Sequence, residues 1–229
     1  MPPTETGPAP GDAVQGSGAA PKPRVRDRIL DTARNLFYRY GLRAVGVEAI
    51  ASEAGTNKMS FYRCFDSKDE LIAEYLREQG QDYWAWWDGA IAPHAGDARR
   101  QIEALFDNYM RLTCKDGSRG CSFGNAVVEL PEGDHPGRRV IETHKAEMRS
   151  RLRVLSAEAG ASDPEALGDT LMLLMEGGYL SRLSFQSQGP LTVAGKAVRT
   201  LLDAHIPVPS ADAVPPGRAA RRRGTAPAG

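Results

Sequence analysis

The sequence predicts an all-α protein with a three-helix unit near the N-terminus and a longer helical remainder. Apolar side chains recur at steps of three and four residues through most of residues 24–206, which is the period of one helix face. Glycines and capping residues separate these runs at intervals typical of helix ends. No run of alternating apolar and polar residues leads into a hairpin turn, so strands are not expected.

The first predicted helix spans residues 25–40. Val25, Ile29, Ala33 and Phe37 lie at steps of four and share one face. Gly41 follows as a C-terminal stop, because glycine adopts the left-handed conformation that commonly ends a helix.

Two short helices follow, and a turn joins them. Val47 and Ile50 begin a short apolar face that ends at Gly55. Asn57 is a favourable N-cap for the next helix, which carries Phe61 on its apolar side.

A fourth helix begins after Ser67, which is a favourable N-cap. Glu70, three residues later, predicts a capping box in which each side chain bonds the other residue's backbone N–H. Leu71, Ile72 and Leu76 supply its buried side.

Longer helices are expected in the rest of the chain. Asp163-Pro164 is a clear start signal, with a cap before a proline at the first helical position. The expected ranges are about 97–115, 120–130, 136–160, 164–187 and 190–204.

Composition divides the chain into four segments. The ends, 1–23 and 207–229, are rich in proline and poor in large apolar side chains, so disordered tails are expected there. The basic run Arg221–Arg223 lies in the second tail. Between the tails we expect two folded parts, the three-helix unit over 24–77 and the longer helical part over 78–206.

Composition also excludes several classes of protein. No run of 18 apolar residues exists, so a membrane-spanning helix is not expected. Three cysteines, Cys64, Cys114 and Cys121, are too few for a disulfide framework and suit the reducing cytoplasm. No cofactor motif, metal-ligand spacing or catalytic motif is present, so no enzyme, cofactor or metal site is expected.

The formal net charge of zero conceals an uneven distribution. Residues 24–77 hold 10 basic and 8 acidic side chains, whereas residues 78–206 hold 14 basic and 18 acidic ones. A specific DNA-binding surface beside an acidic body fits this pattern better than a non-specific nucleic-acid coat does.

The short second and third helices form a helix-turn-helix pattern. Gly55 lets the chain turn sharply, so the third helix can project into a DNA major groove. Lys58 or Arg63 could bond guanine, and Met59 could touch a thymine methyl.

Residues 44–71, AVGVEAIASEAGTNKMSFYRCFDSKDEL, are similar to the DNA-binding segment of the tetracycline-repressor (TetR) family of bacterial regulators. The resemblance covers about residues 24–77, and it rests on Val47, Ile50-Ala51, Ala54-Gly55, Asn57, Phe61-Tyr62, Phe65, Ser67-Lys68, Glu70 and Leu71. It implies a ligand-responsive regulator, more specifically a repressor, that contacts DNA through Arg43, Val47, Thr56, Asn57, Lys58, Met59, Ser60, Tyr62, Arg63 and Lys68.

Two positions depart from the family pattern. Gly46 stands where Ser or Thr is usual, and Cys64 stands where histidine is common. One or two phosphate contacts of relatives are therefore expected to be absent.

The resemblance also implies a homodimer on a palindromic double-stranded operator and a small-molecule effector, since one recognition helix reads only a few base pairs. The expected pocket residues are Trp84, Phe106, Tyr109, Cys121, Phe123, Asn125, His144, Met148, Met172, Met175, Glu176 and Tyr179. The expected dimer interface, helped by close approach at Gly177 and Gly178, comprises Leu167, Leu171, Leu174, Gly178, Leu183, Val198 and Leu201.

Three alternatives stay open at this point. Cys121 lies at a predicted helix start, which lowers thiol pKa, so it could be a redox or electrophile sensor, although a small buried hydrophobe is the simpler interpretation. A helical enzyme would need a base such as His144, and a protein-sequestering module would function without Tyr62 and Lys68.

Overall fold

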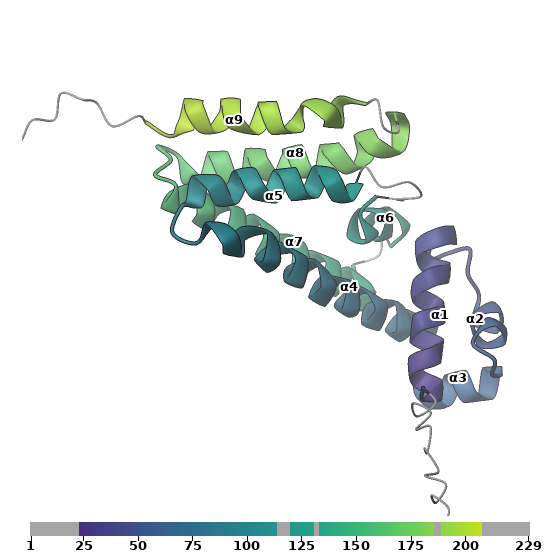
Figure 1. Ribbon diagram of the computed structural model, residues 1–229. Coiled ribbons are helices and arrows are strands. Elements are labelled where there is room, and N and C mark those ends of the chain that lie inside the picture. Colours follow the sequence, from purple (N-terminus) through teal and green to yellow (C-terminus); the bar gives the residue numbers. More distant parts are fainter. Residues whose placement is uncertain (1–22, 114–119, 131–132, 186–188, 208–229) are drawn as a thin grey trace, which may run out of the picture.

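The computed structural model describes residues 23–113, 120–130, 133–185 and 189–207, and these residues fold entirely as helices and their connections (Figure 1). In chain order the helices are α1 (Val25–Tyr40), α2 (Val47–Glu53), α3 (Lys58–Cys64), α4 (Lys68–Ile91), η1 (Ala92–His94), α5 (Ala98–Thr113), α6 (Ser122–Glu129), α7 (Pro136–Glu158), α8 (Pro164–Phe185), η3 (Pro190–Val193) and α9 (Ala194–His205). The predicted all-α class is confirmed. The predicted tails, Arg221–Arg223 and Cys114 lie outside the described residues.

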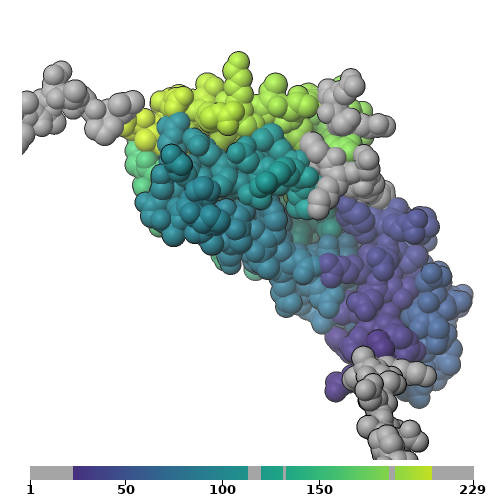
Figure 2. Space-filling model, in the orientation of Figure 1, coloured from purple at the N-terminus to yellow at the C-terminus, as the bar shows by residue number. Residues whose placement is uncertain are grey.

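The apolar side chains form two separate cores. The first gathers residues of α1 to α3 with the first half of α4, and it also takes in Phe123, Ala126 and Leu130 of α6 and its flank. The second lies among α5, the later part of α7, α8 and α9, with Trp87 and Ala90 from the second half of α4. Helix α4 therefore runs from one core to the other, and the three N-terminal helices form one end of an elongated molecule (Figures 1 and 2).

Local chemistry explains the ends of the N-terminal helices. Gly41 and Gly55 have φ of +89° and +63°, a region that side chains with a Cβ rarely adopt. The Asn57 side chain accepts a hydrogen bond from Ser60 N at 2.9 Å, and the Ser67 side chain accepts one from Glu70 N at 3.0 Å. The two predicted N-caps are thus confirmed.

The reciprocal half of the predicted capping box is wrong. The Glu70 carboxylate accepts a hydrogen bond from Arg77 Nη1 at 3.0 Å, and Arg77 lies two turns further along the same side of α4. The guanidinium, two turns away, adds the attraction of a full positive charge to the hydrogen bond, which a backbone N–H does not offer.

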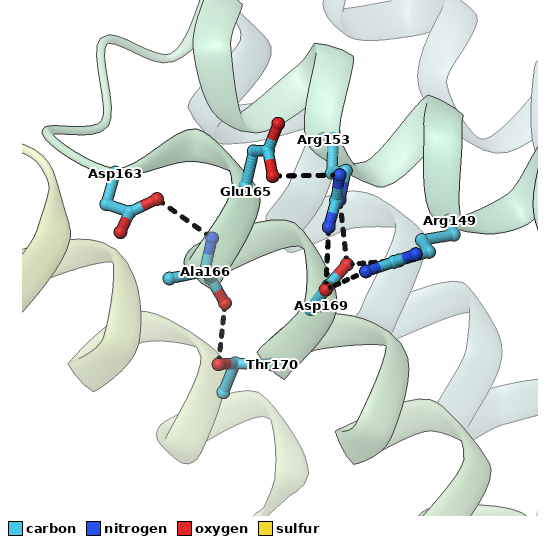
Figure 3. A network of polar contacts seen from close by, with 7 residues as sticks. All are labelled: Arg149, Arg153, Asp163, Glu165, Ala166, Asp169 and Thr170. Atoms are coloured by element: carbon cyan, nitrogen blue, oxygen red, sulfur yellow. Dashed lines mark hydrogen bonds and ion pairs between the residues drawn. The ribbon is translucent and has the colours of Figure 1, made fainter.

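A polar network joins α7 to the start of α8 (Figure 3). Arg149 and Arg153 both hold the Asp169 carboxylate, with Nε to Oδ1 distances of 2.8 Å in each case. The two guanidiniums hold the pKa of Asp169 well below its usual range. Asp163, the predicted cap, accepts a hydrogen bond from Ala166 N at 3.0 Å.

Candidate DNA-binding surface and effector cleft

Helix α3 is anchored by one side and open on the other. Phe61 is fully buried and packs edge-on against Tyr62 and tilted against Phe65, with ring centroids 5.3 and 5.8 Å apart. On the outer side Met59 is 73% exposed and Tyr62 is 47% exposed. Because Met59 and Tyr62 are not used to pack α3 against the rest of the protein, this side of the helix is free to contact a partner.

Arginines tie this helix to its frame. Arg26 of α1 places its guanidinium 4.9 Å from the Phe65 ring centroid and pairs with Glu74 of α4 at 3.1 Å. Arg28 Nε donates to the Ala54 carbonyl at 3.2 Å, at the end of α2. These contacts join α1 to its three neighbours, so the orientation of α3 follows that of α1 and α4.

The cations of α3 already have partners on the same surface. Lys58 Nζ lies 3.0 Å from Glu48 Oε1 of α2, and this hydrogen bond raises the pKa of Lys58. Arg63 Nη2 donates to Ser60 Oγ at 2.9 Å. Both side chains are exposed, so a phosphate or a base edge can compete for them.

The other predicted DNA contacts occupy varied positions. Asn57 is exposed, Thr56 and Ser60 are half-buried, and Val47 packs partly against the first core. Lys68 is half-buried at the start of α4, and burial lowers its pKa.

Arg43 links α6 to the loop between α1 and α2. Its backbone N–H donates to Glu129 Oε2 at 2.9 Å, and its Nε donates to the Glu129 carbonyl at 3.0 Å. Gly41 lies so close that a Cβ there would be 2.9 Å from Glu129 Oε1. Arg138 of α7 binds the same end of α6, donating to the Val127 and Leu130 carbonyls at 3.1 Å. Helix α6 therefore connects the helix-turn-helix frame to α7.

A cleft of about 680 Å³ opens between α4 and α7, with Phe123 of α6 at its floor. We call it the α4–α7 cleft. It is lined by Glu70, Leu76, Arg77, Gly80, Gln81, Trp84, Phe123, Pro136, Arg139, Val140, Thr143, His144, Glu147 and Arg151. Its volume falls within the range of small-molecule sites.

His144 is the buried polar residue of this cleft. Its ring stacks on Phe123, with centroids 3.7 Å apart and planes 3° from parallel, and it meets Tyr83 edge-on at 4.7 Å. The side chain is 5% exposed, and Nε2 is buried without a hydrogen-bond partner among the described residues. Burial, with a smaller contribution from the Lys145 ammonium, lowers the pKa of His144 from 6.5 to about 4.

This lowered pKa predicts a pH-dependent stability. Between pH 6.5 and 4 the unfolded chain binds a proton at His144 that the folded protein does not, so stability is fully present above pH 6.5 and declines as pH falls through this window. We expect His144→Phe, which retains the stacked ring, to lose less stability over the same window. Thermal unfolding of both proteins at several pH values measures the difference; curves that stay parallel would contradict the buried neutral imidazole.

The structure brings three of the predicted pocket residues, Trp84, Phe123 and His144, into the cleft. Four others, Phe106, Tyr109, Met148 and Met175, are buried as part of the second core and do not line this cleft, so their place in a pocket stays a prediction. Tyr109 donates to the Met175 carbonyl at 2.8 Å, which explains why a polar aromatic is buried there.

The remaining predicted pocket residues apart from Cys121 lie on α8 and α6 and do not line the cleft. Met172 and Tyr179 pack against the second core, and Glu176 forms an ion pair with Lys145. Asn125 lies within α6.

Cys121 stands at the N-cap of α6, as predicted, but its chemistry differs from the prediction. Burial raises the pKa of the Cys121 thiol and outweighs the opposing effects of Lys145 and of the backbone N–H groups of α6. A protonated thiol is a poorer nucleophile than a thiolate, so these surroundings favour the simpler interpretation of Cys121 as a small apolar side chain.

Seven residues of α7 line the cleft. Of these, only His144 was among the predicted site residues. Pro136, Val140, Thr143, Glu147 and Arg151 recur at steps of three and four, so they share one helix face. This face adjoins the buried apolar stripe of α7, and His144 lies where the two meet.

The predicted dimer interface needs a correction. Leu167, Leu171, Gly178 and Val198 are buried within the subunit, and a Cβ at Gly178 would lie 2.6 Å from Tyr109 Oη. The glycine therefore admits a neighbour of its own chain. Leu174 and Leu201 are half-buried against the second core, and only Leu183 is exposed.

A different row of apolar side chains lies on the outside of α8. Leu173 is 71% exposed and Leu180 is 67% exposed, and the exposed Leu183, three residues after Leu180, continues the apolar surface toward the end of the helix. Large apolar side chains that gather on one outer surface are typical of contacts between proteins.

Comparison with known proteins agrees with the geometry. The family model described as "Bacterial regulatory proteins, tetR family" matches residues 29–75. The HTH-type transcriptional repressor KstR2 of Rhodococcus jostii (strain RHA1) is 36% identical over 159 residues, which cover 68% of this chain and 72% of the relative.

Solved structures extend the likeness over the whole fold. SCO4454, a TetR-family transcriptional regulator from Streptomyces coelicolor, is 29% identical with a TM-score of 0.75, over 79% of this chain and 95% of that one. A putative TetR-type regulator from Streptomyces avermitilis is 31% identical with a TM-score of 0.72, over 80% and 98% of the two chains.

Helix α3 is short and exposed on one side, and its other side packs against α1, α2 and α4. This arrangement and the relatives define a helix-turn-helix transcriptional regulator. The chain belongs to the TetR family of bacterial regulatory proteins. This family consists of regulators and not of enzymes, as the absence of catalytic motifs predicted. Among the described residues, no helix combines the length and apolar character that crossing a membrane requires.

Proposed function

We propose that the protein is a ligand-responsive repressor that binds a palindromic operator as a homodimer in the cytoplasm. The observation that carries this proposal is the outer side of α3, where Lys58, Met59, Tyr62 and Arg63 are exposed around a fully buried Phe61. Lys58 and Arg63, which are suited to phosphate and base contacts, thus lie on a helix whose orientation is fixed by the packing of its buried side. The relative KstR2 bears the name of a repressor, which supports the direction of control.

The dimer is proposed to form through the outer row of α8. Two half-sites demand two recognition helices at a defined separation, and Leu173, Leu180 and Leu183 supply an apolar surface for a second copy. The row includes Leu183 of the predicted interface in place of the residues that are buried within the subunit.

Effector control is proposed to act through the α4–α7 cleft and α6. Phe123 lines the cleft, and Glu129 at the other end of the same short helix holds Arg43 and approaches Gly41. A ligand that favours one position of α6 would thereby shift the population of dimers toward a separation of recognition helices that the operator does not fit.

The division into domains is also a proposal. Residues 24–77 carry the DNA-binding frame, and residues 78–206 carry the dimer row and most of the cleft lining, which Glu70, Leu76 and Arg77 complete from the other segment. The first core crosses this boundary, because it includes Phe123, Ala126 and Leu130. We therefore expect α6 to stay with the DNA-binding frame when the two parts move.

Gel-shift titration with DNA from upstream of the protein's own gene tests the proposed function. We expect salt-sensitive, sequence-selective binding, and we expect Tyr62→Ala with Lys68→Ala to weaken it by about tenfold or more, since each removes a predicted phosphate contact. The matched control, Tyr40→Ala with Lys196→Ala, removes an exposed tyrosine and an exposed lysine outside the helix-turn-helix and should bind as the wild type does. Equal weakening by both double variants, or no selective binding at all, would contradict the proposal.

A further inference from the structure

The α4–α7 cleft has an aromatic and aliphatic floor. Trp84, Phe123 and the stacked His144 ring lie together there, with Leu76 and Val140 beside them. Flat aromatic walls favour a ligand with rings, because rings can stack or meet edge-on with them. The volume of about 680 Å³ allows a body of several fused rings.

Three arginines line the cleft, and two of them are neutralised within the protein. Arg77 pairs with Glu70 and Glu74 at 3.0 Å each. Arg151 pairs with Glu147 at 2.7 Å and Asp88 at 2.9 Å, and its guanidinium lies 4.2 Å from the centroid of the Trp84 ring. Their acidic partners balance the charge of these two side chains.

Arg139 differs from the other two arginines. It is exposed, and within the described part of the chain no hydrogen bond or ion pair involves its guanidinium group. An unbalanced guanidinium at the edge of an apolar cleft is a site for a carboxylate or a similar anion, which it can bind through two parallel hydrogen bonds.

His144 supplies a second polar feature that lacks a partner. Its side chain is 95% buried in the cleft floor, yet Nε2 makes no hydrogen bond to any described residue. Gly80 leaves space beside the same ring, since a Cβ there would lie 3.8 Å from Nδ1. A buried polar atom without a partner costs free energy, and a bound molecule that reaches the ring can recover it.

We propose that the α4–α7 cleft binds an apolar, ring-bearing molecule with one anionic group, whose rings stack in the Trp84–Phe123–His144 floor and whose anion pairs with Arg139. This inference rests on the proposed function, because it names the chemical class of the effector. Charge complementarity selects the anion, and the unpartnered imidazole selects a polar atom near the ring system.

The matched probes are 1-pyrenebutyrate and its neutral amide, which differ in charge but hardly in size. Binding is followed by quenching of tryptophan emission, because all three tryptophans, Trp84, Trp86 and Trp87, lie on α4. We expect the full-length wild type to bind the carboxylate roughly fivefold more tightly than the amide.

Two variants assign the effect to residues. Arg139→Gln should remove the preference for the carboxylate, and His144→Phe, which retains the stacked ring, should leave that preference in place. Arg199→Gln, an exposed arginine on α9, is the control and should leave both affinities unchanged. Because Arg139 is exposed, its variant is expected to fold even if the His144 variant does not.

Equal affinity for the two probes, absence of saturable quenching by either, or an unchanged preference in Arg139→Gln would overturn the ligand class. Operator binding is measured separately by gel shift in the same samples. Intact operator binding with a failed probe series refutes only the ligand class, whereas loss of selective operator binding refutes the proposed function whatever the probes show.

Discussion

Replacing Phe61 by alanine is expected to lower the free energy of unfolding of the first core by about 3–5 kcal/mol and to abolish operator binding. Phe61 is fully buried and is the residue through which α3 is fixed to its frame. Truncation leaves a cavity beneath a helix of seven residues, which is too short to persist without packing.

The experiment separates the two cores by their signals. All three tryptophans lie in or against the second core, so tryptophan emission follows that core, while far-UV circular dichroism follows all helices. In Phe61→Ala we expect helicity to fall at a denaturant concentration that leaves the tryptophan signal unchanged. Coincident transitions would show that the chain unfolds as one unit and would contradict the proposed division into domains.

Phe61→Leu is the graded control for this variant. It retains an apolar side chain in the cavity, so a smaller loss of stability and measurable operator binding are expected. If alanine and leucine were equivalent, burial of the ring would not be what holds α3.

The parts of the fold that the sequence predicts well are those set by neighbouring residues. Gly41 and Gly55 end helices because of their own backbone freedom, and Asn57 and Ser67 begin helices because their side chains reach a backbone N–H three residues ahead. Such signals need no knowledge of distant contacts, and the predicted helix ranges agree with the observed ones within a few residues, except that the continuation of α4 to Ile91 was not predicted.

The cleft and the outer row depend on distant contacts, and there the predictions fail in part. Helix α8 carries apolar residues on more than one side, so periodicity alone does not tell whether Leu171 or Leu173 is buried. The same holds in α7, where Met148 lies in the core and Thr143 lines the cleft. Which side of α7 and which side of α8 faces inward depends on where α4, α5 and α9 pack against them.

The close approach of α7 and α8 is a similar case, since a glycine within a helix does not indicate in the sequence which residue packs against it. Gly168→Ala is expected to lower the free energy of unfolding of the second core by up to about 3 kcal/mol, through steric overlap. A Cβ at this position would lie 2.7 Å from Arg153 Cγ and 2.8 Å from both the Cα and the N atom of Arg153. A flexible side chain could move aside, but backbone atoms of α7 cannot move without separating the two helices.

That separation would also disturb the bonds from Arg153 and Arg149 to Asp169, which is the next residue of α8 (Figure 3). Chemical denaturation followed by tryptophan emission measures the loss, because α7 and α8 both build the second core. The matched control is Gly89→Ala in α4, where nothing lies within 4 Å of the added Cβ. Alanine there should stabilise the helix by about 0.5–1 kcal/mol, so the two glycine variants should move in opposite directions. If Gly168→Ala proved as stable as Gly89→Ala, the helices would have room to part, and close packing at Gly168 would not hold the effector domain together.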